Sequence, residues 1–168
     1  MRTDRWPDLR ATCMSFAAVL MVLLVTACSG DPPSGPVAIK YGRDTCAYCG
    51  MIISDPRFAA QIRGGPDHKA YKFDDLGEGL VWLEKQPWKG DAKIEMWVND
   101  MDTGKSWLDA RKAFYVPVRM SPMGFNYGAL PQSREGALAF DEFRKKVLES
   151  RAALMCERRE SAKAETQP

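Results

Sequence analysis

The pattern of apolar and polar positions in the first half of the chain predicts a strand pair, a helix and a third strand. Residues 58–63 and 69–73 favour strands, and the Gly-Gly-Pro-Asp sequence between them is typical of a hairpin turn. A helix is expected next, because Asp75 and Glu78 have the spacing of an N-terminal capping box and leucines follow at helical intervals. Apolar side chains then alternate with polar ones over residues 93–99, which indicates a strand with one buried face.

The second half of the chain repeats this plan in a looser form. Residues 112–118 and 124–130 are predicted strands, joined by a turn with the sequence Met-Ser-Pro-Met-Gly. A last helix with one apolar stripe is expected over residues 133–158. In the first half, a short strand over residues 37–41 is expected to lead into a sulfur-bearing loop. Each half therefore has a sulfur-bearing turn, strands and an amphipathic helix.

This order of elements predicts an α+β fold with antiparallel strands. We expect one domain over residues 37–158, made of two related lobes, residues 37–104 and 105–158, with one helix each. The Pro, Gly and Ser residues of segment 28–36 are typical of a flexible tether, and the small and charged residues of segment 159–168 indicate a disordered tail. If the lobes are related, the sulfur-bearing turns occupy comparable positions and can face each other.

The start of the chain has the pattern of a secretory signal peptide. Basic residues precede an apolar run over residues 13–25, which is short for a helix that spans a bilayer. The Val-Thr-Ala-Cys sequence that ends at Cys28 resembles a bacterial lipobox, so residues 1–27 are expected to be removed and Cys28 to carry lipid. A plain secretory signal and an uncleaved anchor are the alternatives. Ser29 follows the cysteine in place of Asp, which favours attachment to the outer membrane, with the domain at its periplasmic face.

Composition narrows the classes of function. The chain has 24 Lys and Arg against 22 Asp and Glu, and no basic run is interleaved with aromatic residues, so no nucleic-acid partner is expected. The one histidine, His68, lies in the predicted hairpin turn without a nucleophile beside it, and we expect no enzyme. Once the signal peptide and Cys28 are set aside, the cysteines are Cys46, Cys49 and Cys156. This odd number argues against a disulfide framework.

Residues 46–51, with the sequence Cys-Ala-Tyr-Cys-Gly-Met, place three sulfur side chains close together. A thiol–disulfide centre depends on a stabilised thiolate, often at a helix N-terminus, but the Gly-Met-Ile-Ile-Ser-Asp-Pro sequence after Cys49 is a poor start for a helix. A structural zinc site usually has four Cys or His ligands, and the chain offers too few. Cu(I) favours soft sulfur ligands, which Cys46, Cys49 and Met51 supply.

Two further methionines, Met120 and Met123, flank the Ser-Pro turn of the second half, which is a poor place for core side chains. They are therefore candidate ligands beside Cys46, Cys49 and Met51. A thiol–disulfide redox lipoprotein remains one alternative to a copper protein. A structural lipoprotein with a simple Cys46–Cys49 disulfide is another.

Several short motifs follow the sulfur loop in a defined order. They are Phe58-Ala59-Ala60-Gln61-Ile62, Lys72-Phe73-Asp74-Asp75, Trp97-Val98-Asn99-Asp100, Trp107-Leu108-Asp109-Ala110-Arg111, Ala113-Phe114-Tyr115-Val116 and Ser121-Pro122-Met123-Gly124. Together with the lipobox cysteine and the sulfur loop, this order resembles that of the NosL-type lipoproteins, accessory proteins of nitrous oxide reductase. The resemblance covers nearly all of the chain between Cys28 and the last helix.

The resemblance implies a membrane-anchored periplasmic Cu(I)-binding chaperone, which delivers copper to an acceptor enzyme for assembly of the nitrous oxide reductase copper centres. It also implies two small lobes of ββαβ type. Cys46, Cys49, Met51 and Met123 fall on the family's ligand pattern. Some members have a histidine near the downstream methionine, and this chain has none there. The resemblance therefore implies either an all-sulfur ligand set or an altered metal function.

Overall fold

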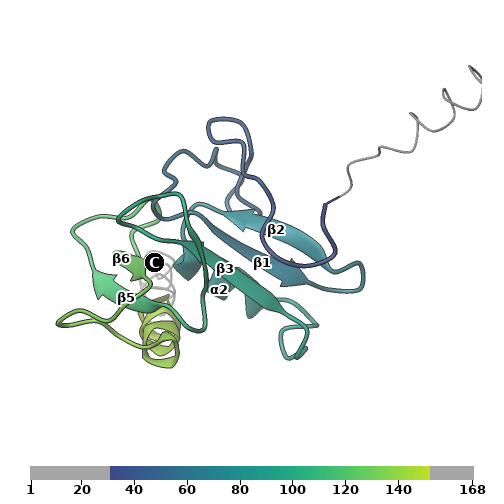
Figure 1. The fold of residues 1–168 in the computed structure, drawn as a ribbon. Helices are drawn as coiled ribbons and strands as arrows, with labels where there is room; N and C mark the ends of the chain where they lie inside the picture. The colour runs from purple at the N-terminus through teal and green to yellow at the C-terminus, as the bar shows by residue number, and fades with distance from the viewer. Residues whose placement is uncertain (1–30, 152–168) are drawn as a thin grey trace, which may run out of the picture. The chain divides into compact units, whose positions relative to one another are not determined.

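The protein forms two antiparallel sheets, each accompanied by a helix (Figure 1). The structure is a computed structural model that describes residues 31–151. The elements are β1 (Ala60–Gly64), β2 (Lys69–Phe73), α2 (Leu76–Leu83), β3 (Glu95–Asn99), β4 (Trp107–Asp109), β5 (Phe114–Pro117) and β6 (Tyr127–Leu130). A C-terminal helix follows and is described over residues 140–151. The first sheet has the order β2-β1-β3-β4, and β5 pairs with β6 in the second.

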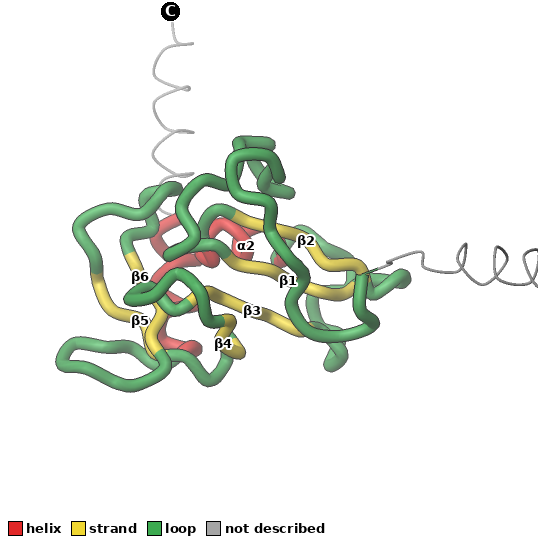
Figure 2. The backbone as a smooth tube through the Cα atoms, turned by 45° about the horizontal axis from the view of Figure 1, so that its top comes forward, coloured by secondary structure: helices red, strands yellow, loops and turns green. Residues whose placement is uncertain are grey.

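Strand β1 is buried along its whole length because both faces of the first sheet are covered at this point. Ile62 of β1 and Phe73 of β2 pack under α2, which lies behind the sheet in Figure 2. Gln61 and Arg63 alternate with Ile62 and face the other side, where segment 35–38 crosses the sheet. Gln61 and Arg63 are polar residues in a buried strand, and the backbone of segment 35–38 supplies their hydrogen-bond partners.

The strand predicted over residues 37–41 does not form, and this prediction is wrong. The backbone N–H of Val37 donates to Oε1 of Gln61 at 2.9 Å, and the Gln61 amide donates to the Val37 carbonyl at 2.7 Å. Arg63 donates in the same way to the carbonyl of Gly35 at 3.1 Å. Because side chains of β1 satisfy these backbone groups, the segment needs no neighbouring strand.

The second sheet packs against the C-terminal helix through aromatic side chains. Tyr115 of β5 stacks on Phe143, with the ring centroids 3.9 Å apart. The predicted start of this helix at residue 133 is wrong, because the helix begins at residue 140. Residues 134–137 form a turn in which Gly136 has a φ of 76°, and Leu138 then forms a bridge with Tyr115, so the backbone before residue 140 is not helical.

The two halves of the chain are joined in one core. Strand β4, which the sequence did not predict, follows the midpoint of the chain but pairs with β3 in the first sheet. The loop between β5 and β6 also reaches the first half, since Phe125 packs against Gly77 of α2. Buried side chains from both halves form one continuous cluster. This shared core brings loops of both halves to the beginning of α2.

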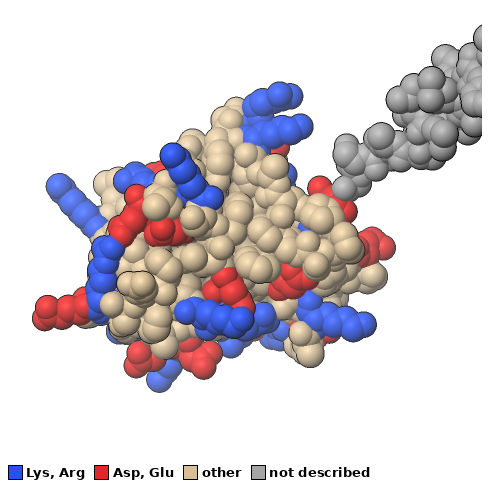
Figure 3. Space-filling view, in the orientation of Figure 1, with Lys and Arg blue, Asp and Glu red and all other residues tan. Residues whose placement is uncertain are grey.

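Several predicted features lie outside the described residues. These are the signal peptide over residues 1–27, the lipid-attachment residue Cys28, the end of the last helix, Cys156 and the tail over residues 159–168. Within residues 31–151, the helices are too short or too polar to cross a membrane. Basic and acidic side chains are interspersed on the face of the molecule that Figure 3 shows.

Candidate metal centre

The sulfur loop is a tight turn that is hydrogen-bonded to itself and to the first sheet. Cys46 donates its backbone N–H to the carbonyl of Met51 at 2.8 Å, and Gly50 donates its own to the carbonyl of Cys46 at 3.0 Å. Gly50 has a φ of 74°, a left-handed conformation that glycine adopts without a steric penalty. The N–H of Ala47 bonds to the carbonyl of Lys72 in β2. These bonds fix the directions in which the two cysteine side chains leave the loop.

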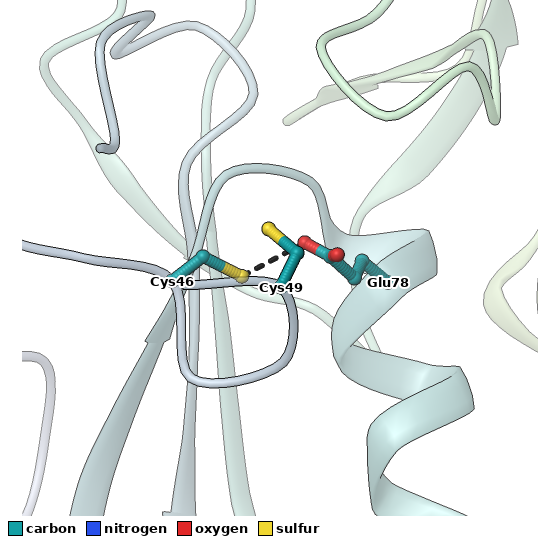
Figure 4. Close-up of side chains that lie close together, drawn as sticks. All are labelled: Cys46, Cys49 and Glu78. Carbon is teal, nitrogen blue, oxygen red and sulfur yellow. Dashed lines mark hydrogen bonds between the residues drawn. The ribbon is translucent and has the colours of Figure 1, made fainter. Parts of the chain in front are cut away.

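Cys46, Cys49 and Glu78 bring their donor atoms together at the first turn of α2 (Figure 4). One sulfur atom from each cysteine and one oxygen of the carboxylate all lie within 4.8 Å of one another. The thiol of Cys46, only 3% exposed, donates to Oε2 of Glu78 at 2.8 Å. Cys49 is exposed, and both cysteines are free thiols. The cluster thus has a buried inner thiol, an open outer thiol and a buried carboxylate, a set that can hold a metal ion.

The role of Glu78 differs from the one predicted. Asp75 caps α2 as expected, with its Oδ1 accepting from the N–H of Gly77 at 2.8 Å. Glu78 does not complete a capping box, because the sulfur loop lies against this turn and its carboxylate accepts from Cys46 instead. No local sequence signal marks this role, because Gly77 on one side of Glu78 makes room for Phe125, and Gly79 on the other makes room for Phe73 and Ile62.

The sulfur loop of residues 46–51 and the downstream sulfur-bearing turn of residues 120–124 both line a surface groove of about 440 Å³, and this turn is called the second sulfur loop. Met51 and Met120 both line this groove, and their side chains are 56% and 75% exposed. Met123 is half-buried and is not among the residues that line the groove. The structure therefore brings two of the three candidate methionines, Met51 and Met120, to one groove and leaves Met123 out of its lining.

Both sulfur loops are attached to the first turn of α2. On one side the thiol of Cys46 bonds to Glu78. On the other side the hydroxyl of Ser121, between the two downstream methionines, donates to Oδ2 of Asp75 at 2.5 Å and accepts from the N–H of Asn126 at 2.9 Å. The first turn of α2 thus holds both loops in place, although about 70 positions of the chain separate them.

His68 does not join the cluster. It lies in the turn before β2, where its Nε2 is 3.1 Å from Oε1 of Glu95, whereas the sulfur loop contacts the other end of β2. The site described here therefore has no imidazole ligand.

Comparison with known proteins identifies the family. The NosL family model matches residues 36–144 of this chain. The chain belongs to the NosL family. The resemblance predicted from the short motifs is thereby confirmed. No curated protein sequence matches.

A solved structure agrees with the NosL assignment. The crystal structure of the copper chaperone NosL from Shewanella denitrificans is similar, with a TM-score of 0.51 at 20% sequence identity. The match covers 68% of this chain and 89% of that one. It confirms for this NosL-family chain the predicted α+β fold, with antiparallel strands and one helix in each lobe.

Burial determines the protonation state of the inner thiol in this NosL-family site. Removal of Cys46 from water, together with its hydrogen bond to Glu78, raises the pKa of the thiol to about 12, and hydrogen bonds from the loop backbone act in the opposite direction. The Cys46 thiol is therefore protonated at neutral pH. A metal ion that binds this sulfur has to displace its proton.

Proposed function

We propose that this protein is a lipid-anchored periplasmic Cu(I) chaperone that delivers copper for the assembly of nitrous oxide reductase copper centres. The observation that carries the proposal is the meeting of the Cys46 and Cys49 thiols in a loop whose Met51 lines a groove with Met120, in a chain of the NosL family. The similar crystal structure is of a protein described as a copper chaperone, which supports the same function.

The donor set favours Cu(I) over harder ions. Cys46 and Cys49 offer two thiolates, and Met51, two residues further on, offers a thioether. Glu78 is a hard oxygen donor, and we assign it to orienting the inner thiol through the hydrogen bond that it accepts. A structural zinc site needs four ligands, and in residues 31–151 no further His, Cys, Asp or Glu joins this cluster.

The exposure of the site suits transfer better than permanent storage. Cys49 and Met51 are both exposed, so an incoming ligand of an acceptor can reach copper from the solvent side while the buried Cys46 still holds it. In this scheme copper is cargo and is passed on by ligand exchange. The protein needs no catalytic group for this step, in line with the expectation that it is not an enzyme.

Membrane attachment is the part of the proposal that rests on Cys28 and the Val-Thr-Ala-Cys sequence. With residues 1–27 removed, lipid on Cys28 would hold the domain at the periplasmic face of the outer membrane by segment 28–36. Labelling of cells with a tritiated fatty acid tests this point. The label should enter the wild-type protein and be lost in Cys28→Ser, and incorporation into that variant would refute lipidation at this residue.

Anaerobic titration of the purified protein with Cu(I), in competition with a chromophoric chelator, tests the metal site. Cys46→Ser and Cys49→Ser should each weaken binding by more than about 100-fold, because loss of a residue that only supports a ligand already costs about 10–100-fold. The matched control is Ala47→Ser, an exposed position between the two cysteines. Wild-type affinity in Cys49→Ser would refute the site.

Two alternatives give different results in the same preparation. A redox protein would reduce insulin disulfides without affinity for copper. A structural disulfide between Cys46 and Cys49 would leave these two residues unreactive toward a thiol reagent in protein isolated anaerobically, and peptide mapping separates them from Cys156. The loop conformation does not favour the redox alternative, because residues 50–56 form no helix that would stabilise a reactive thiolate.

A further inference from the structure

The exposed large apolar side chains of this protein gather around one groove. Within residues 31–151 these side chains are Tyr41, Met51, Ile52 and Met120, and all except Tyr41 line the groove beside the sulfur loop. An exposed apolar cluster next to polar groups is typical of a surface that binds another protein. The groove is also held in shape before any partner arrives, because its two sides are attached to the same turn of α2.

The groove also contains a buried acceptor without a donor. The carboxylate of Asp74 lines the groove and is only 3% exposed, and its Oδ1 accepts no hydrogen bond. A buried polar atom without a partner is destabilising, and a donor from outside would relieve this cost. The other charges in the lining cancel, because Arg57 donates two hydrogen bonds to the carboxylate of Asp55. Asp74 is therefore the charged group of the lining that has no counter-ion there.

We propose that this groove is the docking surface for the copper-acceptor protein, which inserts an apolar side chain between Ile52 and the two methionines and directs a Lys or Arg side chain at Asp74. This inference rests on the proposed chaperone function. An acceptor bound in the groove contacts the loop that carries the outer thiol, because Met51 lines the groove and belongs to the same loop as Cys49. Docking and ligand exchange then take place at adjoining points of one surface.

Ile52→Lys tests the docking surface without touching a sulfur atom. The Ile52 side chain is 54% exposed, so the substitution should leave the fold intact while it removes an apolar contact and places a positive charge opposite the incoming cation. The matched control is Ala92→Lys, which makes the same charge change at an exposed position before β3 and outside the groove. Both proteins are loaded with one equivalent of Cu(I), and stopped-flow mixing follows transfer to copper-free nitrous oxide reductase and to the chelator bathocuproine disulfonate.

The expected result is a transfer rate to the reductase that falls at least about tenfold in Ile52→Lys, the size of one lost anchor contact. Cu(I) affinity and the rate of transfer to the chelator should stay within about twofold of the values for Ala92→Lys. Asp74→Asn should weaken the salt dependence of transfer to the reductase, because it removes the charge that attracts the cation.

Three outcomes overturn the inference. Equal rates to the reductase in Ile52→Lys and in the control would show that the acceptor docks elsewhere, while intact Cu(I) binding would leave the chaperone function standing. A wild-type protein that binds Cu(I) but transfers none to the reductase would refute both the delivery and the docking. A wild-type dimer that Ile52→Lys converts to a monomer, measured by analytical ultracentrifugation, would assign the groove to a second copy of this chain.

Discussion

The carboxyl of Asp75 offers a test of the structure that does not depend on any metal. Burial raises its pKa to about 6 from an ordinary value of 3.8, and the hydrogen bonds from Ser121 and Gly77 only partly oppose this shift. A carboxyl whose pKa is higher in the folded state than in the unfolded state binds its proton more tightly when folded. The free energy of unfolding should therefore fall as the pH rises from about 4 to about 6.

The substitution Asp75→Asn removes this titration and keeps the hydrogen bonds. The amide oxygen can still accept from Gly77, and the amide nitrogen can donate to the hydroxyl of Ser121. A shift of about two pKa units corresponds to about 3 kcal/mol, since one unit is worth about 1.4 kcal/mol. Relative to wild type, the variant should therefore gain up to about 3 kcal/mol in free energy of unfolding between about pH 4 and about pH 7.

Urea unfolding at a series of pH values measures this difference directly. Asp44 and Asp55, whose pKa values are lowered by hydrogen bonds to cationic side chains, affect the stability mainly below this pH range and contribute equally to both proteins. Asp67→Asn at an exposed turn position provides the matched control. A difference between Asp75→Asn and wild type that stays constant over this pH range would refute the burial argument.

Three further predictions concern packing, the covering segment and the metal site. A Cβ at Gly77 would lie 2.4 Å from the ring of Phe125, so Gly77→Ala should lower the free energy of unfolding by about 1–3 kcal/mol in spite of the better helix propensity of alanine. Gly90→Ala is the control, because a Cβ there meets no atom within 4 Å and should leave the free energy of unfolding unchanged. Equal urea midpoints for the two variants would contradict this prediction. Gln61→Leu leaves both backbone groups of Val37 without their partners. Limited proteolysis near residue 37, followed by mass spectrometry, should therefore become at least about tenfold faster. An unchanged rate would mean that the Gln61 amide does not hold this segment. Because the thiol of Cys46 stays protonated up to about pH 12, Cu(I) has to displace its proton, and the Cu(I) affinity should rise with pH. Cys46→Ser should lower the slope of log affinity against pH by about one. Identical slopes for the variant and wild type in chelator competition would exclude this sulfur as a ligand.

Local signals in the sequence predicted much of the first sheet. Strand β2 has the predicted bounds, because its turn and its strand-favouring residues are both local features. Asp75 caps α2 for the same reason. Features that depend on contacts between distant segments were missed or misassigned. Val37 lies beside Gln61, 24 positions away, and no property of its own segment shows that a side-chain amide replaces a strand.

The candidate site divides in the same way. Cys46, Cys49 and Met51 share one short loop, so their proximity follows from the sequence alone. Glu78 joins them from 32 positions away, and its spacing from Asp75 matches a common motif that explains it differently. The relation of Met120 to Met51 depends on contacts between the two halves of the chain, the bond between Ser121 and Asp75 and the packing of Phe125 on Gly77.

The hydrogen bonds that hold Gly35 have a consequence for how far the domain can travel. If lipid is attached at Cys28, the anchor is only seven positions along the chain from Gly35, whose backbone is held by Arg63 and Glu95. A fully extended chain of that length spans at most about 25 Å. The distance between the domain and the lipid surface would then be no larger than the diameter of a small domain. Its diffusion toward a partner would be largely confined to the plane of the membrane. Such confinement raises the effective concentration of any partner on the same membrane and excludes partners that never approach it.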